Sequence, residues 1–177
     1  LKNQVNPHFL FNSLNILDAI VQDGEKEEAS LYIHKLAGIY RYMLQHDSQK
    51  LVTLGEEVTF VTMYADLLRV RFPEGFDVYQ MILDKDLSKK VVPCTLQLLL
   101  ENVTKHNAIS ADKPLRIGVH TDGEYLTMEN DRIPRTSAPV STGLGLPYLR
   151  KQYMDISGKE ILVEQTDDSF RVRIPLL

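Results

Sequence analysis

The run Asn6-Pro-His-Phe-Leu-Phe-Asn-Ser-Leu-Asn15 predicts an amphipathic helix, and the rest of the sequence is organised around it. Apolar residues recur at helical spacing along one face, at Leu10, Leu14, Leu17 and Val21. His8 lies on a different, polar face with Asn12 and Asn15, where a histidine is free to meet another molecule. A simpler interpretation stays open, in which His8 only belongs to a first turn with Asn6 as N-cap and Pro7 at the first helical position.

The composition is that of a globular protein, with 44% apolar and 25% charged residues in a chain of 177. This length suits one good-sized domain or two small ones. A net charge of −4, with no basic block longer than two residues, argues against direct binding to nucleic acid. The single cysteine, Cys94, excludes an internal disulfide framework and is typical of a reducing compartment.

The sequence has no stretch that approaches the ~20 uninterrupted apolar residues of a membrane-spanning helix. It begins with leucine in the middle of a motif, so we expect a fragment. Contact with a membrane would then come only through a missing N-terminal segment.

Residues 1–73 are predicted to be a helical region. A second helix carries an apolar face of Ala29, Ile33, Leu36, Tyr40 and Met43. Thr53-Leu-Gly-Glu56 has the pattern of a capping box at the start of a third helix. That helix has a seam for a partner helix, at Leu54, Val58, Val61, Ala65, Leu68 and Phe72. We expect a symmetric homodimer to cover these stripes, unless they pack on the second half of the chain.

Residues 74–177 are predicted to form an α+β domain, because the apolar period changes after Pro73-Glu-Gly75. A strand is expected near residues 76–83. A helix is expected to begin at Pro93, with a buried face made of Leu96, Leu99, Leu100 and Val103. Two hairpins are indicated around Asp122-Gly123 and Asp167-Asp168, and a further helix is indicated within residues 143–156.

Polar residues gather on the helix expected after Pro93. Helical spacing places Asn102 and His106 on one face, with Glu101 and Lys105 next to them. An amide oxygen can ligate Mg²⁺, and Lys105 and His106 can donate hydrogen bonds to phosphate oxygens. The alternative is a solvated helix face with an incidental salt bridge.

A third cluster is Ser141-Thr-Gly-Leu-Gly-Leu-Pro-Tyr-Leu-Arg150. Glycines at the N-terminus of a helix let backbone N–H groups approach an anion, and the positive end of the helix dipole favours binding of that anion. Glycine can also simply end a loop, so this pattern alone is weak evidence.

Taken in order, these three segments resemble the H-box, N-box and G2 box of the LytS/YehU-type sensor histidine kinases. The resemblance implies that His8 receives the γ-phosphoryl group of ATP and that Asn102 holds the Mg²⁺ ion. It implies a role in catalysis for Glu101, and an ATP site whose further residues are Lys105, His106, Asn130, Thr142, Gly143, Leu144, Gly145 and Leu146.

The implied fold is a dimerising, histidine-bearing helical region, residues 1–73, followed by an ATP-binding α/β sandwich of the GHKL (Bergerat) type, residues 74–177. The implied function is ATP-dependent autophosphorylation and phosphotransfer to an aspartate of a response regulator. The chain would be the cytoplasmic fragment of a bacterial inner-membrane sensor protein.

One segment departs seriously from the family pattern, and Tyr148 also stands where many relatives have asparagine. The family's G1 box usually reads Asp-x-Gly-x-Gly, whereas this chain has Asn130-Asp-Arg-Ile-Pro134, without either glycine. The oxygen of Asn130 can still accept a hydrogen bond from the adenine amino group, but it carries no charge. A second hypothesis therefore stays open, a non-catalytic dimeric signalling scaffold that retains the kinase fold.

Overall fold

A computed structural model describes residues 7–136 and 145–177. The described part begins with a helical hairpin, α1 (Pro7–Gln22) and α2 (Lys26–Gln45). Strand β1 (Val52–Thr53) and helix α3 (Leu54–Arg71) follow it. The remaining elements are β2 (Phe76–Met81), the 3₁₀ turn η1 (Asp84–Asp86), β3 (Lys90–Val91), α4 (Thr95–His106), β4 (Leu115–Thr121), β5 (Tyr125–Asp131), α5 (Leu146–Ser157), β6 (Leu162–Gln165) and β7 (Ser169–Pro175).

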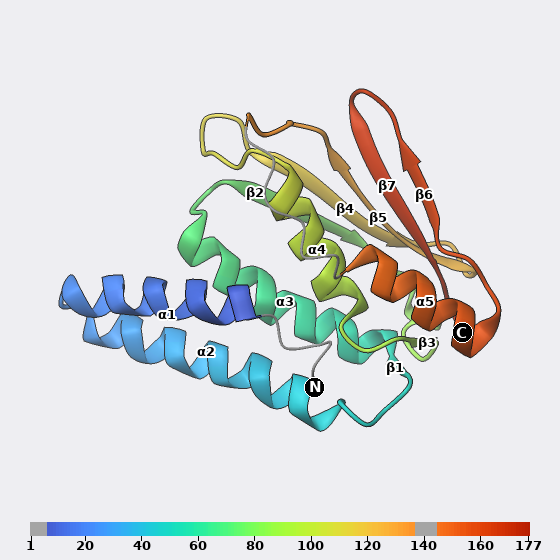
Figure 1. Cartoon of the computed structure of the whole chain (residues 1–177), viewed down its shortest axis with the longest axis horizontal. Helices are drawn as coiled ribbons and strands as arrows, with labels where there is room; N and C mark the ends of the chain where they lie inside the picture. Colours follow the sequence, from blue (N-terminus) through green and yellow to red (C-terminus); the bar gives the residue numbers. More distant parts are fainter. Residues whose placement is uncertain (1–6, 137–144) are drawn as a thin grey trace.

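The second half of the chain is a five-stranded sheet with helices on one face. The strand order is β2-β4-β5-β7-β6, in which β2 and β4 are parallel and the other neighbours are antiparallel. Alternate residues of β4 are buried, at Leu115, Ile117 and Val119, as expected for a strand with one covered face. Helices α4 and α5 lie over that face (Figure 1). The predicted α+β fold and both predicted hairpins are confirmed.

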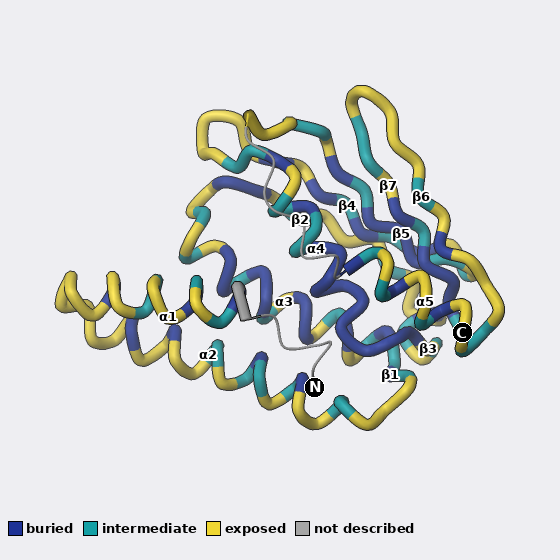
Figure 2. Tube along the Cα trace, viewed as in Figure 1, coloured by how far each residue is buried: buried dark blue, intermediate teal, exposed yellow. Residues whose placement is uncertain are grey.

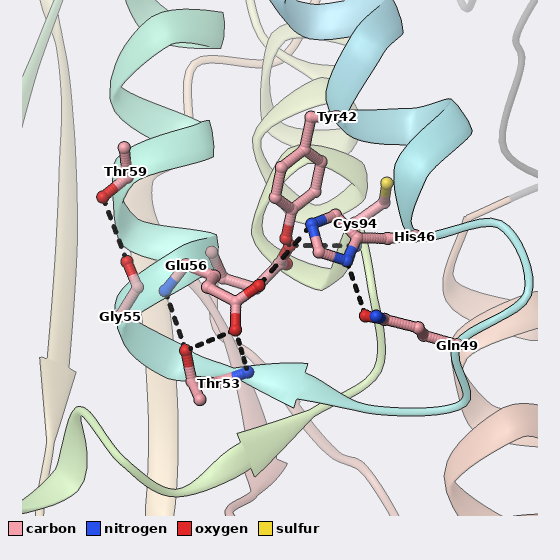
Figure 3. Close-up of polar contacts among 9 residues, drawn as sticks. Tyr42, His46, Gln49, Thr53, Gly55, Glu56, Thr59 and Cys94 are labelled. Carbon is pink, nitrogen blue, oxygen red and sulfur yellow. Dashed lines mark hydrogen bonds and ion pairs between the residues drawn. The ribbon is translucent and has the colours of Figure 1, made fainter.

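The capping box at the start of α3 is also confirmed (Figure 3). The hydroxyl of Thr53 accepts a hydrogen bond from the Glu56 N–H at 3.1 Å. The Glu56 carboxylate accepts from the Thr53 N–H at 3.4 Å. Two backbone donors that the first turn of a helix leaves without partners are thus satisfied.

The buried face of α1 differs from the predicted one. Phe9, Ser13 and Ile20 are buried, whereas Leu14 and Val21 of the predicted stripe are 47% and 55% exposed. The helix has apolar residues on more than one side, and packing against α2 selects the side that carries Phe9. Figure 2 shows the outer turns of α1 and α2 largely exposed, while burial concentrates in α3, α4 and the central strands.

A similar correction applies to α2. Ile33 was expected on its buried face but is 48% exposed, and the buried side chains are Ala29, Tyr32, Ile39 and Met43. Helix α2 contacts both α1 and α3, so the buried line faces the space between these two helices. One residue along a helix turns the side chain by about 100°, which is enough to move Ile33 out of that space.

Helix α3 connects the two halves of the chain. Its predicted seam is largely buried, and the partner helices are α2 and α4 of the same chain. The region expected to be wholly helical also contains β1, which pairs with β3 in an antiparallel ladder, Val52 opposite Val91. One hydrophobic core runs from Phe9 to Leu176. The boundary between residues 73 and 74 stays a prediction.

These contacts predict how fragments will fold. A fragment of residues 51–177 should unfold cooperatively, whereas residues 74–177 should be far less stable because α3 is missing. Losing the buried Phe60, Val61 and Leu67, at roughly 1.5–3 kcal/mol each, removes a large part of the ~5–15 kcal/mol that stabilises a typical domain. Urea denaturation followed by circular dichroism measures the difference, and equal midpoints would show that α3 is dispensable.

Candidate functional site

A cleft of about 740 Å³ lies where α1, α2, α3 and α4 meet the segment after β5. Its apolar lining comes mainly from Phe9, Tyr32, Tyr64, Leu67, Leu68 and Ile109. Its polar lining comes from Asn12 on α1, Arg71 at the end of α3, Glu101 and Lys105 on α4, and Arg135 after β5. The cleft thus combines an apolar lining with cationic and acidic groups, contributed by segments far apart in the sequence.

Helix α4 positions the acidic group. Its predicted inward residues, Leu96, Leu99, Leu100 and Val103, are all buried. The helix begins at Thr95 rather than at Pro93, because Cys94 adopts a left-handed conformation with φ of 66°. This burial turns Glu101 and Lys105, one turn apart, toward the cleft.

The Glu101 carboxylate is held in place from its own helix. The side-chain amide of Gln97, itself buried, donates a hydrogen bond to Glu101 Oε2 at 2.8 Å. Gln97 precedes Glu101 by one turn, so the contact fixes the carboxylate along the cleft side of α4. A positioned, half-buried carboxylate can accept a proton or orient a hydrogen-bond donor.

Asn102 and His106 do not line this cleft, although both were predicted to belong to the site with Glu101. The half-buried side-chain amide of Asn102 makes no hydrogen bond with another described residue and is available to a ligand. Burial and the nearby charges of Lys105 and Arg135 lower the pKa of His106 below its usual value, which favours the neutral imidazole.

The donor set fits a magnesium ion carried by a nucleotide. Within residues 7–136 and 145–177, no three His, Cys, Asp or Glu side chains cluster in a way that could hold a metal. A single amide ligand such as Asn102 suits Mg²⁺, which takes most of its oxygens from water and phosphates.

The end of α4 is tied to the segment after β5 by residues that sequence reasoning missed. Asn107, which is buried, donates from Nδ2 to Val103 O at 2.9 Å and accepts at Oδ1 from the Ile133 N–H at 2.9 Å. Arg135 donates to Lys105 O at 3.2 Å. These bonds hold Arg135 beside the cleft, where its charge can meet an anion.

Asn130 lies on β5 and is buried, on the same side of the strand as Leu126 and Met128. Its Nδ2 donates to Asp131 O at 2.7 Å, which leaves the side-chain oxygen as an acceptor. The helices cover this side of the sheet, as the predicted role in an adenine pocket requires. That role itself stays a prediction.

The remaining predicted residues are only partly described. Gly145 is the N-cap of α5 with φ of 106°, a conformation that glycine adopts without strain, and Leu146 is the first residue of that helix. His8 lies in the first turn of α1, as predicted, but its side chain is outside the described part of the structure. Thr142, Gly143 and Leu144 also lie outside the described residues.

A buried carboxylate near α4 was not predicted at all. Glu57 on α3 is fully buried and accepts hydrogen bonds from the Tyr42 hydroxyl at 2.6 Å and from the Cys94 and Leu96 N–H groups at 3.0 and 3.2 Å. The sequence carried a signal, because Glu57 follows Leu54 by three positions and precedes Val61 by four. An acidic residue at that spacing sits within an apolar helix face.

Comparison with known proteins identifies relatives. The sequence model described as histidine kinase matches residues 1–76. Sensor protein LytS of Staphylococcus haemolyticus is 29% identical over 174 residues, covering 89% of this chain and 30% of that protein. Sensor histidine kinase BtsS of Escherichia coli K12 is 30% identical over 165 residues, covering 90% of this chain and 29% of that protein. This chain therefore spans less than a third of the length of these relatives.

Solved structures share the fold. The nucleotide-free catalytic domain of histidine kinase ThkA aligns with a TM-score of 0.50 at 15% identity, covering 71% of this chain and 97% of that domain. A structure described as a bacterial phosphotransferase aligns with a TM-score of 0.50 at 14% identity, covering 91% of this chain and 85% of that one. At this level of identity the solved structures show the shared fold alone. The sequence matches show that the chain belongs to the sensor histidine kinase family that includes LytS and BtsS.

Proposed function

We propose that this chain is the core of a two-component sensor histidine kinase, which phosphorylates itself on His8 with ATP and passes the phosphoryl group to an aspartate of a response regulator. The observation that supports this most is the shared cleft. Asn12, one turn after His8 on α1, lines the same cavity as Glu101 and Lys105 of α4. The helix that carries the acceptor thus faces the helix that carries the proposed catalytic carboxylate.

The proposed ATP site lies around α4, β5 and the start of α5. Asn102 would ligate Mg²⁺, Lys105 and His106 would donate to phosphate oxygens, and Asn130 would accept from the adenine amino group. The predicted phosphate-binding residues on the glycine-rich segment are Thr142, Gly143, Leu144, Gly145 and Leu146. When bound, Mg²⁺–ATP supplies the phosphoryl group, and the metal neutralises part of its charge.

The proposed chemistry is an in-line transfer. A ring nitrogen of His8 forms a bond to the γ-phosphorus as the bond from that phosphorus to the ADP oxygen breaks. Glu101 would accept a hydrogen bond from the other ring nitrogen and so orient the imidazole. Lys105 and Arg135, which line the cleft, would neutralise charge on the transferring group.

The proposed cellular setting is the cytoplasmic side of a bacterial inner membrane, in a longer sensor protein. Among the residues that the structure describes, no helix is long and apolar enough to cross a membrane. The relatives are about three times as long as this chain, which supports a larger whole protein with a separate sensing part.

The hairpin is the proposed dimer interface. Large apolar side chains on α1 and α2 are 47% to 63% exposed: Phe11, Leu14, Val21, Leu31, Ile33 and Leu44. Large apolar side chains that are exposed along both helices of one hairpin are typical of an interaction surface. Two such hairpins can cover each other's apolar sides in a four-helix bundle.

A second candidate is a non-catalytic dimeric scaffold that keeps the kinase fold. One specific observation favours it, the uncharged Asn130 at the position of the family's G1 aspartate in a segment without glycine. Such a scaffold would signal through the dimer surface of the hairpin and would not need phosphoryl transfer. The first of the following experiments separates the two candidates.

His8→Gln should abolish acid-labile labelling by γ-labelled ATP with Mg²⁺ while leaving nucleotide binding intact, because glutamine has no imidazole nucleophile. His34→Gln is the control, since His34 is exposed on α2 and its Nδ1 lies 2.7 Å from Ser30 O. The kinase proposal is supported if the wild-type protein and the His34→Gln control are both labelled while the His8→Gln variant is not. An unlabelled wild-type protein favours the scaffold, and a labelled His8→Gln protein shows that another residue is the acceptor.

Asn102→Ala should weaken Mg²⁺-dependent ATP binding at least about tenfold, equivalent to ~1.4 kcal/mol, because it removes the proposed metal ligand. Isothermal titration calorimetry with Mg²⁺–ATP measures this loss. Asn15→Ala, on the exposed side of α1, is the matched control and should bind as the wild type does. Unchanged affinity in the Asn102 variant would remove this residue from the nucleotide site.

Replacing Leu14 and Val21 together by glutamate should convert the dimer into a monomer, because buried charges without partners are unstable. Sedimentation equilibrium at about 100 μM protein measures the mass of each form. The control variant has glutamate in place of Tyr79 and Met81, which are exposed on β2. This variant should remain dimeric. A wild-type monomer at this concentration contradicts the bundle, and a dimer that dissociates only in the control places the interface on the sheet.

A further inference from the structure

The carboxyl group of Glu57 is buried without a cation beside it. It is 0% exposed, and within the described residues no Lys, Arg or His side chain forms an ion pair with it. Its partners are three hydrogen-bond donors instead, the Tyr42 hydroxyl and the Cys94 and Leu96 N–H groups. Burial raises the pKa of Glu57, and these hydrogen bonds oppose that effect.

Two of these donors belong to the first turn of α4. The N–H groups there have no partners within the helix, and the positive end of the helix dipole favours a carboxylate. Cys94, the N-cap residue, provides no side-chain cap of its own. Glu57 therefore caps α4 from α3, a helix that precedes it by a long stretch of sequence.

The third donor belongs to the hairpin. The Tyr42 ring, on α2, stacks on Phe60 with 4.0 Å between ring centroids. It also packs against His46 with 4.3 Å between ring centroids (Figure 3), and these two contacts hold it in one orientation. Its hydroxyl is thereby directed at Glu57 Oε2, 2.6 Å away. This hydrogen bond joins the proposed phosphoacceptor hairpin directly to the group that caps α4.

The same end of α4 is also joined to α5. Tyr153, fully buried on α5, accepts a hydrogen bond from the Val92 N–H at 2.9 Å and lies 2.8 Å from Thr95 Oγ1. Helix α5 begins directly after the glycine-rich segment. The start of α4 is thus the point at which α2, α3 and α5 are connected by hydrogen bonds.

We propose that Glu57 is a positioning residue for phosphoryl transfer, and that the Tyr42–Glu57 hydrogen bond couples the orientation of the hairpin to that of α4. The inference rests on the proposed kinase function. Glu101 follows Leu96 by five residues, about 7.5 Å along a rigid helix, so a tilt at the capped end moves the Glu101 carboxylate relative to α1. If the Tyr42–Glu57 hydrogen bond is lost, Glu57 still caps α4. The angle between α4 and the hairpin is then no longer fixed by this bond.

Tyr42→Phe tests the coupling, because it removes one hydroxyl and keeps the stacked ring. At saturating Mg²⁺–ATP, the autophosphorylation rate per folded molecule should fall about tenfold or more, while the ATP Kd changes less than about threefold. Tyr40→Phe is the matched control. It removes a buried hydroxyl from the same helix, and that hydroxyl has no hydrogen-bond partner among the described residues, so the rate should equal that of the wild type.

The possible outcomes separate the inference from the proposed function. A wild-type rate in Tyr42→Phe overturns the coupling and leaves the kinase assignment standing, since the wild-type protein is then labelled. Equal losses in both tyrosine variants, or a parallel loss of ATP affinity, also overturn it, because they indicate general damage. A wild-type protein that is never labelled refutes the kinase function, and the inference with it.

Glu57→Gln provides a second measurement that does not depend on activity. Glutamine keeps the size of the side chain but replaces one acceptor by a donor facing other donors. Hydrogen exchange of the Cys94 and Leu96 amides should accelerate at least about tenfold in Glu57→Gln and stay near wild type in Tyr42→Phe. Unchanged protection in Glu57→Gln would show that the carboxylate does not hold the start of α4.

Discussion

The capping of α4 by the buried carboxylate of Glu57 is the interaction on which the arrangement of the site depends. Helix α4 carries the proposed catalytic and metal-binding groups, and its first turn offers backbone donors that water cannot reach. Removing one partner from such a buried group leaves an unsatisfied polar atom, which costs more than the net contribution of an ordinary hydrogen bond. The fold tolerates this buried carboxyl group because two helix amides and the Tyr42 hydroxyl donate hydrogen bonds to it.

The position of the hairpin follows from the same arrangement. Phe9 of α1 packs against Tyr64 of α3 at 5.3 Å between ring centroids, and α2 is held through Tyr42. These contacts leave the outer apolar sides of α1 and α2 uncovered while placing the inner side against the cleft. One hairpin thus has two sides, an outer apolar side that is the proposed dimer surface and an inner side that lines the cleft.

Sequence reasoning succeeded where local periodicity and capping decide the structure. The capping box at Thr53, the inward leucines of α4 and the hairpin at Asp122-Gly123 all follow from residues a few positions apart. It failed where tertiary contacts choose between apolar faces of one helix, as for Ile33 and Tyr32 on α2. It also missed Arg135, whose partner lies 30 residues away, and Glu57, whose partners lie 15, 37 and 39 residues away. No local sequence pattern identifies such distant partners. An acidic residue within an apolar helix face, as at Glu57, indicates only that the side chain needs a partner.

The central proposal is that a nucleotide bound around α4 delivers its phosphoryl group to His8 on α1. Mass spectrometry of the wild-type protein after incubation with Mg²⁺–ATP, digested at neutral to alkaline pH to preserve phosphohistidine, tests this most directly. The predicted result is one phosphorylated site, at His8, within the peptide that contains the Asn6–Asn12 run. Phosphate on a peptide that contains His34, His46 or His120 instead, or on no peptide at all, would contradict it.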